Sequence, residues 1–87
     1  MNKKEKEIFK TIRILCGPMR FRILIALSGA GRSGLSVTNM ALIFNTTLSR
    51  ISHQLQILRK HKFVKATKRN HEVVYTLSDH RVQKYLS

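Results

Sequence analysis

Acidic residues are scarce in this 87-residue sequence, which has 4 Asp and Glu against 17 Lys and Arg and a formal charge of +13. No acidic residue occurs between Glu7 and Glu72. An enzyme that uses paired carboxylates would have to assemble them from the two ends of the chain. The composition therefore argues against an enzyme. It favours a polyanionic partner, because self-repulsion destabilises a compact basic domain unless opposite charge relieves it.

Cysteine and long apolar runs are also scarce. The single cysteine, Cys16, excludes an internal disulfide and Cys₄ or Cys₂His₂ zinc modules, and we expect it to be a core residue rather than a redox sensor. The longest unbroken apolar runs cover residues 23–27 and 40–44, whereas a membrane-spanning helix needs about 20 residues. Lys10 and Arg13 interrupt any apolar signal segment near the start. We therefore expect one cytoplasmic domain over residues 1–87, with no membrane partner.

Apolar periodicity and helix-capping residues predict a mainly helical chain. Pro18 is suited to the first turn of a helix that is apolar nearly all round, which predicts a central place in the fold. Thr38 and Thr47 are expected to cap two further helices, with Asn45 left-handed between them. Residues 28–34 have the composition of a loop and lack the Gly-Lys-Ser/Thr ending of a phosphate-binding loop. The predicted helices cover residues 4–15, 18–27, 39–44, 48–61 and 80–86.

Two segments, residues 63–68 and 73–77, predict a β-hairpin joined through Asn70, a residue that tolerates positive φ. An isolated hairpin is marginal in water, so we expect it to pack on the helices, with residues 35–37 as a third strand. Tyr75 is expected in the core. The predicted fold class is mainly α with a small β-hairpin wing, a winged helix-turn-helix of order α-α-β-α-α-β-β-α.

The helix predicted over residues 48–61 has a polar face opposite an apolar stripe of Ile51, Leu55 and Leu58. An ordinary surface helix would pair Glu with Lys at i, i+4, and this helix has no acidic residue. A short helix, a tight turn and a polar-faced helix are typical of a helix-turn-helix, whose second helix enters the major groove. Arg can read guanine there and Gln adenine. The candidates to read base edges are Ser49, Arg50, Ser52, His53 and Gln56.

Phosphate contacts are expected beside these positions. Thr47 and the helix N-terminus that it caps suit a phosphate, because free backbone N–H groups point outward there. His53 could contact a phosphate instead of a base. A solvated hairpin without a ligand is the alternative for the wing, above all for Lys65. The residues expected to place the wing against the DNA backbone or minor groove are Lys65, Lys68, Arg69 and His71.

Four segments carry motifs of one known family. Residues 17–24 resemble its Asp-Pro-x-Arg-x-x-Ile-Leu segment, and residues 35–37 match its Leu-Ser-Val lead-in. Residues 47–59 resemble its recognition segment, Ser-x-Ser-x-x-Ser-His-His-Leu-x-x-Leu-Arg, and residues 74–79 resemble its wing, which ends in Val-Tyr-x-Leu-x-Asp. Over about residues 12–79 the chain thus resembles the ArsR/SmtB family of dimeric bacterial and archaeal repressors. The resemblance implies a homodimer that binds double-stranded DNA at an inverted repeat.

The sequence departs from the metal-sensing members of that family. Their Cys-x-Cys would fall at Ser36 and Thr38, and neither residue can supply a thiolate. A second kind of site begins with Asp and His on the last helix, where Asp79 and His80 stand, but the second ligand pair is missing. We therefore expect no metal site and no cofactor. Lys62 stands where the family prefers Gly, and because a left-handed Lys costs on the order of 1 kcal/mol, the conformation of that turn is open.

The two ends of the chain hold more apolar surface than one small core can use. By the family resemblance, the helices at residues 4–15 and 79–86 build a two-fold interface; packing of these helices on each other is the alternative. Two other functions also stay open: a nonspecific nucleic-acid or chromatin-type binder of viral or plasmid origin, and a winged-helix module for an acidic protein. The candidate interface residues are Ile8, Phe9, Ile12, Val82, Tyr85 and Leu86.

Overall fold

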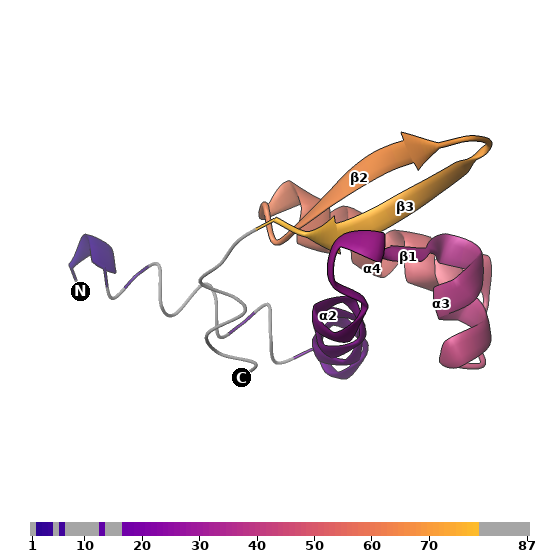
Figure 1. Ribbon diagram of the computed structural model, residues 1–87. Helices are drawn as coiled ribbons and strands as arrows, with labels where there is room; N and C mark the ends of the chain where they lie inside the picture. The colour runs from indigo at the N-terminus through magenta and orange to yellow at the C-terminus, as the bar shows by residue number, and fades with distance from the viewer. Residues whose placement is uncertain (1, 5, 7–12, 14–16, 79–87) are drawn as a thin grey trace.

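The computed structural model describes residues 2–4, 6, 13 and 17–78 of the chain. Its elements are α2 (Pro18–Ala30), the 3-10 turn η1 (Gly31–Ser33), β1 (Leu35–Ser36), α3 (Val37–Ile43), α4 (Leu48–Lys60), β2 (Val64–Arg69) and β3 (Glu72–Leu77). The strands form an antiparallel sheet in the order β1-β3-β2. Figure 1 shows β2 and β3 as a hairpin that extends over the helices, with α2 and α3 beneath it.

The predicted fold class is confirmed in its coarse form. Within residues 17–78 there are three helices and a three-stranded antiparallel sheet, and residues 35–36 supply the third strand, paired with β3. The predicted helices at residues 4–15 and 80–86 lie outside the described residues, except for Lys4, Lys6 and Arg13. The full order of elements therefore stays a prediction at both ends of the chain.

Helix α2 is longer than predicted and less buried. Pro18 lies in its first turn, as expected, but the helix continues to Ala30 and passes into η1 where a loop was predicted. It ends where Gly31 adopts a φ of 58°, which an L side chain rarely tolerates. Its core-facing side lies at the centre of the described fold, as predicted, but Phe21 and Ile25, four residues apart on another face, are exposed.

Helix α3 begins two residues earlier than predicted. The hydroxyl of Ser36 accepts a hydrogen bond of 3.1 Å from the backbone N–H of Asn39, so Ser36 is the N-cap and Thr38 lies inside the first turn. The prediction that Thr38 caps this helix was wrong. Ser36 ends β1 with an extended backbone, and the chain passes directly from strand to helix. Asn45 after the helix has a φ of 50°, as predicted.

Helix α4 follows the prediction closely. The hydroxyl of Thr47 accepts a 3.1 Å hydrogen bond from the N–H of Arg50, and the helix ends at Lys60 with His61 as its C-cap. Lys62 then adopts a φ of 64°, so the turn keeps the left-handed conformation despite its lysine. Two hydrogen bonds from Ser78 hold this turn. Its hydroxyl donates to the carbonyl oxygen of Lys62 at 2.6 Å, and its backbone N–H donates to the carbonyl oxygen of Phe63 at 3.0 Å.

The hairpin is one residue longer on each strand at its tip than predicted. Arg69 pairs with Glu72, and the turn is reduced to Asn70 and His71, with Asn70 at a φ of 56° as expected. A two-residue turn with positive φ matches the twist of the two strands. Gly34 lies tightly against β3, where a Cβ would stand 2.5 Å from the carbonyl oxygen of Tyr75. Only glycine allows this approach.

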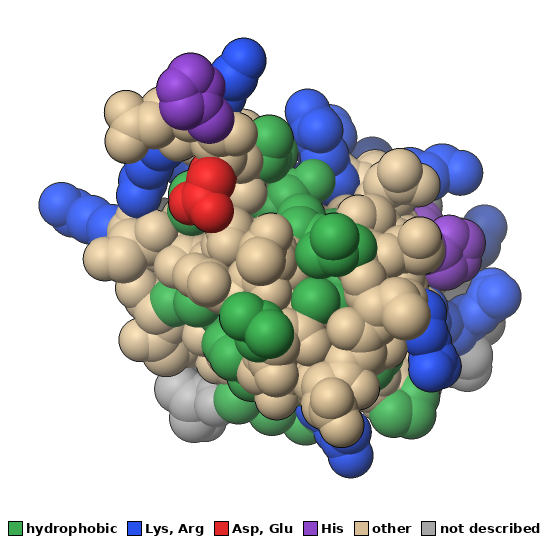
Figure 2. All heavy atoms as spheres, turned by 90° about the vertical axis from the view of Figure 1, so that its right-hand side faces the viewer, with side chains coloured by type: hydrophobic (Ala, Val, Ile, Leu, Met, Phe, Trp, Pro, Cys, Tyr) green, Lys and Arg blue, Asp and Glu red, His purple; other side chains and the backbone are tan. Residues whose placement is uncertain are grey.

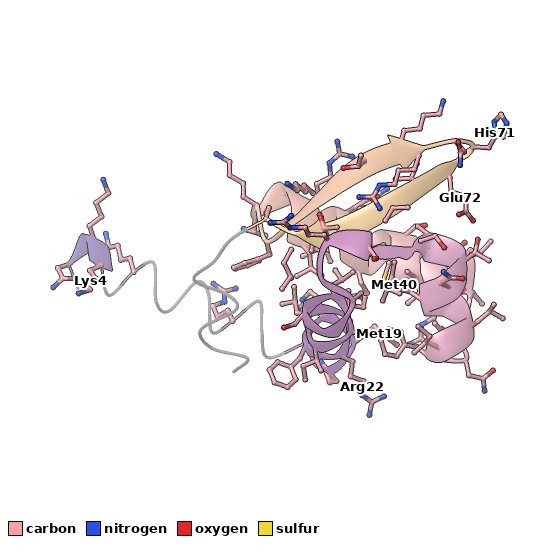
Figure 3. All side chains as sticks on the ribbon, viewed as in Figure 1. Lys4, Met19, Arg22, Met40, His71 and Glu72 are labelled. Atoms are coloured by element: carbon pink, nitrogen blue, oxygen red, sulfur yellow. The ribbon has the colours of Figure 1, made fainter. Side chains whose placement is uncertain are left out.

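The core lies where the three helices meet the sheet. The predicted stripe Ile51, Leu55 and Leu58 is fully buried, and Tyr75 packs against the core, so both predictions are confirmed. Met19 and Met40 lie between α2 and α3 in Figure 3. The side chains with less than 2% of their surface exposed are Ile23, Leu24, Leu27, Met40, Ile51, Leu55 and Leu58. This core fixes α4 with its opposite face outward.

Candidate nucleic-acid interface

The outer face of α4 brings together the residues predicted to read bases. Its inner face is held by Ile51, Leu55 and Leu58, so side chains on the other side of the helix project from the fold. Ser52 is half-buried at the edge of this outer face. The exposed residues on it are Ser49, Arg50, His53 and Gln56. The face therefore presents hydroxyl, imidazole, amide and guanidinium groups from one rigid element.

The N-terminus of α4 is also accessible. Thr47, its cap, is exposed, and its hydroxyl takes up the N–H of Arg50 while its carbonyl oxygen accepts from Ile51 at 3.2 Å. The first N–H groups of any helix have no acceptor within the helix and attract anions. The geometry at Thr47 therefore suits a phosphate oxygen, as the sequence predicts.

Arg20 ties α4 to α2. Its guanidinium donates a 3.1 Å hydrogen bond to the amide oxygen of Gln54, on the flank of α4. The same guanidinium packs over Gly17, where an added Cβ would stand 2.5 to 2.8 Å from it. Gly17 has no side chain to cap α2, so its role here is to leave room for Arg20. Arg20 and Gln54 thus set the position of the outer face rather than belonging to it.

An apolar patch adjoins the polar face, and sequence reasoning missed it. Leu42 and Ile43 of α3 are 75% and 57% exposed, and Leu48, the first residue of α4, is 53% exposed. Figure 2, which views the α3 side of the molecule, shows hydrophobic side chains across the middle of this face and Lys and Arg side chains around its edges. Leu48 lies three residues before Ile51 and extends the buried stripe, so periodicity alone assigns it to the core.

The wing separates its basic residues onto two faces. Successive strand residues point to opposite sides, so Lys65 and Arg69 share one face of β2 and Lys68 lies on the other. His71 is exposed at the hairpin tip, beside Glu72, as Figure 3 shows. The sequence analysis grouped these three cations and His71 as one set, but in the structure they point in three different directions.

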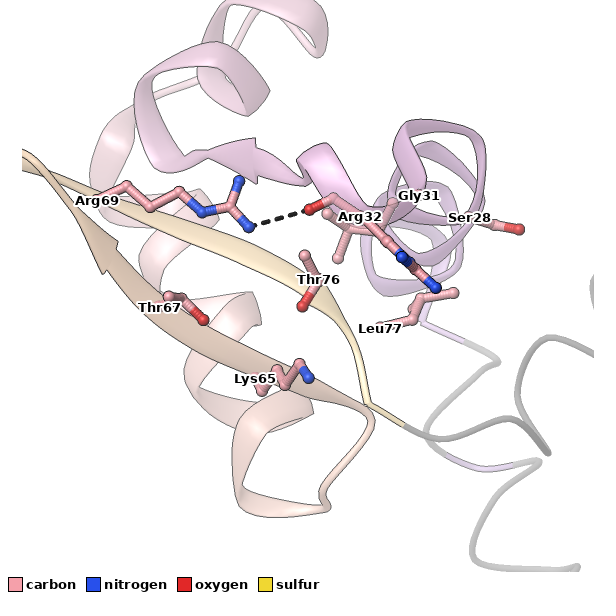
Figure 4. Close-up of a pocket in the computed structure, with 9 residues that line it drawn as sticks. Ser28, Gly31, Arg32, Lys65, Thr67, Arg69, Thr76 and Leu77 are labelled. Carbon is pink, nitrogen blue, oxygen red and sulfur yellow. Dashed lines mark hydrogen bonds between the residues drawn. The ribbon is translucent and has the colours of Figure 1, made fainter.

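Arg69 is held in place by the body of the domain. Its guanidinium donates hydrogen bonds of 3.1 Å to the carbonyl oxygens of Ser33 and Arg32, both in η1. Figure 4 shows the second of these bonds. Arg69 therefore joins the tip half of β2 to the turn that follows α2, a contact between residues 36 and 37 positions apart that no local pattern predicts.

Negative charge is nearly absent around these groups. Glu72 is the only acidic side chain in the described part of the chain, and it lies at the far end of the hairpin. Fourteen of the 17 Lys and Arg residues fall within the same described positions. Arg50 and Lys60 of α4 therefore have no carboxylate of the described residues next to them to compete for their charge.

The described residues form neither of the two kinds of metal site found in the metal-sensing members of the family that the sequence resembles. They contain no group of three or more His, Cys, Asp and Glu side chains arranged to hold a metal ion. Ser36 is buried and uses its hydroxyl as a helix cap, and Thr38 is exposed on α3. Cys16, Asp79 and His80 lie outside the described residues. Within residues 2–4, 6, 13 and 17–78 no helix has both the length and the apolar content to cross a membrane.

The predicted dimer interface is untested. All six of its residues lie outside the described residues: Ile8, Phe9, Ile12, Val82, Tyr85 and Leu86.

The amino-acid sequence is similar to that of one curated transcriptional repressor. No protein-family model matches the chain. The chain is 37% identical over 68 residues to a transcriptional repressor SmtB homolog of Synechocystis sp., an alignment that covers 78% of this chain and 49% of that protein. The chain thus spans about half the length of the curated relative that it matches.

Solved structures share the fold over nearly the whole chain. HlyU from Vibrio cholerae superposes with a TM-score of 0.89 at 26% identity, covering 99% of this chain and 90% of that one. A homodimeric winged helix-turn-helix DNA-binding domain from Mycobacterium bovis, a possible ArsR-family regulator, superposes with a TM-score of 0.78 at 18% identity, covering 99% and 81%, which shows the fold alone. In sequence the chain is similar to this SmtB homolog, and in fold it is a winged-helix protein similar to HlyU and to the M. bovis domain.

Proposed function

We propose that the chain is a sequence-specific regulator of transcription that binds double-stranded DNA as a homodimeric repressor. The observation that carries the proposal is the outer face of α4, where Ser49, Arg50, His53 and Gln56 are exposed together on the helix that follows a short helix and a tight turn. A helix presented in this way fits the major groove. The SmtB homolog of Synechocystis sp. is named a transcriptional repressor, which supports the direction of regulation.

Arg50 is the proposed reader of guanine and Gln56 the proposed reader of adenine. A guanidinium donates two hydrogen bonds to guanine, and an amide both donates to and accepts from adenine, so each contact discriminates by about 1–3 kcal/mol. Ser49, Ser52 and His53 would add single hydrogen bonds to bases or phosphates. Leu48 lies next to this face and is half exposed, which suits contact with a thymine methyl group.

The proposed contacts to the DNA backbone come from Thr47 and the wing. The N-terminus of α4 would receive one phosphate, and the hairpin would reach the flanking backbone or minor groove. Among the described residues, no side-chain hydrogen bond of the kind that holds Arg69 ties Lys68 or His71, at the outer half of the hairpin, to the body of the domain. We assign Arg69 chiefly to positioning of the wing, and Lys65 to the base of the hairpin.

The proposed homodimer would use the terminal segments, residues 4–15 and 79–86. Two α4 helices related by a two-fold axis would lie about 34 Å apart, one turn of DNA, and would read an inverted repeat. The M. bovis domain of the same fold is described as homodimeric, which supports this arrangement. Sedimentation equilibrium of the full chain tests it: we expect a dimer whose dissociation constant rises when Ile12 is replaced by Asp.

The test of base reading starts from a duplex selected out of a random pool by the wild-type chain. Arg50→Ala should weaken binding to that duplex by about 10- to 100-fold, because it removes a bidentate contact, and should weaken binding to a scrambled duplex much less. The matched control is Arg22→Ala, which removes the same charge from an exposed position on α2 that points away from the rest of the fold in Figure 3. Equal losses on both duplexes for Arg50→Ala would refute the proposed role.

Nonspecific binding to nucleic acid is the second candidate, and the charge of +13 favours it. The two candidates differ in their selectivity. A nonspecific binder would enrich no sequence from the random pool, and the logarithm of its binding constant would fall linearly with the logarithm of the salt concentration for every duplex alike. A sequence-specific regulator keeps a preference among duplexes after each phosphate contact has been weakened by salt.

A further inference from the structure

A pocket of about 550 Å³ lies between the end of α2, the turn η1 and one face of the hairpin. This is the face of β2 that carries Lys65, Thr67 and Arg69, and it is turned away from the core-facing side chains Val64 and Tyr75. The volume falls within the range of pockets that bind small molecules in proteins. The pocket is separate from the outer face of α4, which contributes none of its lining residues.

Three cations line this pocket, and none of its lining residues within the described part of the chain is acidic. Arg32 comes from η1, and Lys65 and Arg69 come from β2, so separate elements of the fold bring the charges to one cavity. Positive charges that line one cavity repel one another, and an anion bound between them relieves this repulsion. The pocket therefore has the electrostatic character of an anion site.

Arg69 is preorganised within it. The carbonyl oxygens of Ser33 and Arg32 each accept one N–H of its guanidinium at 3.1 Å, which fixes the plane of the group. A guanidinium has five N–H donors, so these two bonds leave others for a ligand. A guanidinium held in place in this way loses little conformational entropy when it binds an oxyanion.

Thr76 supplies a second, independent observation. It is only 8% exposed, and its hydroxyl oxygen is buried without any hydrogen-bond partner among the described residues. In Figure 4 this hydroxyl lies on the side of the pocket that faces Lys65 and Thr67, and Lys65 is its direct cross-strand partner. A buried hydroxyl without a partner costs about 1–3 kcal/mol, so a ligand group that forms a hydrogen bond with Thr76 would be favoured in the pocket.

We infer that this pocket binds a small phosphorylated molecule, with its phosphoryl group among Lys65, Arg32 and Arg69 and a hydrogen bond to Thr76. Leu27 and Leu77, which also line the cavity, provide an apolar wall for the organic part of the ligand. A phosphate of the DNA backbone shares the same chemistry. A backbone phosphate could reach the exposed cations at the rim of the pocket. Thr76, however, is buried too deeply for a phosphate of a rigid duplex to contact it, which favours a small phosphorylated molecule as the ligand.

Titration calorimetry of the full chain with inorganic pyrophosphate tests the site, at constant ionic strength and with sodium chloride as the reference ligand. We expect saturable binding of one pyrophosphate for each chain. Lys65→Gln should weaken it by about tenfold or more, because it removes a charged donor. The matched control is Lys68→Gln, which removes the same charge from the opposite face of the same strand and should change the affinity less than twofold. Absence of saturable binding, or equal losses for the two variants, would overturn the inference.

Thr76→Val separates the two sources of phosphate. The valine keeps the shape of the side chain and removes the hydroxyl, so we expect pyrophosphate affinity to fall by about 3- to 10-fold while duplex affinity, measured without pyrophosphate, stays the same. An equal loss of duplex affinity would assign the pocket to the DNA backbone and overturn the proposal of a free ligand. Circular dichroism and thermal melting of each variant confirm that it is folded.

The regulatory consequence rests on the proposed DNA binding. An anion bound at the base of the wing cancels positive charge there, so saturating pyrophosphate should weaken binding to the selected duplex by about fivefold or more, and by less than twofold in Lys65→Gln. An unchanged duplex affinity at saturation would overturn this coupling. A chain that binds pyrophosphate and no duplex at all would refute the proposed function and leave the pocket supported, so the two failures are distinguishable.

Discussion

Replacing Arg69 tests whether this residue holds the wing to the body of the domain. Arg69→Gln removes the two hydrogen bonds to the carbonyl oxygens of Ser33 and Arg32, each 3.1 Å long. A hydrogen bond contributes about 0.5–1.5 kcal/mol, and both of these are exposed to water, so we take the lower end and expect about 1 kcal/mol in total. That free energy stabilises the closed hairpin relative to a locally opened one.

Amide hydrogen exchange measures the loss directly. A change of about 1 kcal/mol speeds exchange of the amides near the hairpin tip by about fivefold, with little change in α2 and α4. Lys68→Gln is the control, because it makes the same change of charge one residue away on the opposite face of β2 and breaks neither bond. Exchange that rises equally in both variants would mean that charge, and not the tie to η1, governs the opening of the wing.

Three further predictions concern stability. Ser36→Ala should lower the free energy of unfolding by about 1 kcal/mol, whereas Thr38→Ala should leave it nearly unchanged, because only Ser36 caps α3; chemical denaturation compares them, and a larger loss for Thr38→Ala would contradict the assignment. Thr76→Val should raise the free energy of unfolding by about 1 kcal/mol in buffer without phosphate, since it removes a buried hydroxyl that has no partner; a clear loss would show that the hydroxyl is satisfied. Lys62→Gly should raise the melting temperature by a few degrees, because glycine relieves a left-handed backbone that costs lysine about 1 kcal/mol, and Lys62→Gln, which removes the charge alone, should not.

Local signals in the sequence were sufficient for α4 and for the hairpin. A cap at Thr47, an apolar stripe at Ile51, Leu55 and Leu58, and an asparagine suited to positive φ each act within a few residues, and the structure agrees with all three. The pairing of residues 35–36 with the hairpin followed from a physical need, because two strands alone do not hold together in water.

The errors arose where contacts distant in sequence decide between local alternatives. Two neighbouring hydroxyl residues, Ser36 and Thr38, are both good caps, and the strand that pairs with β3 selects the first. Residues 28–30 remain helical although Ser and Gly disfavour it, since η1 packs against β3 and makes the helix longer. The exposure of Leu48 depends on where α3 ends, which periodicity within α4 does not contain.

The faces of the wing were predictable only in principle. Alternation along a strand is certain once the register is known, but the register depends on the turn, and a turn one residue longer on one side only shifts every pair. The two-residue turn at Asn70 and His71 places Lys65 opposite Thr76 and Arg69 opposite Glu72. The pocket forms because η1 lies against the face of the hairpin that carries Lys65 and Arg69, and no pattern in the sequence predicts this contact.

The polar face of α4 and the basic pocket at the base of the wing are separate surfaces, so a ligand can act on one without touching the other. In the proposed function, the face of α4 would determine which DNA is bound, because its groups are directional, whereas the cations of the wing would add affinity for any phosphate. A regulator that releases DNA in response to a signal can lose its affinity for phosphates without altering its base contacts. Lys65, Arg32 and Arg69 are arranged for this, since one anion in the pocket would cancel charge at the base of the wing while leaving Arg50 and Gln56 in place. Selectivity among duplexes should therefore survive saturation with pyrophosphate, even as every affinity falls.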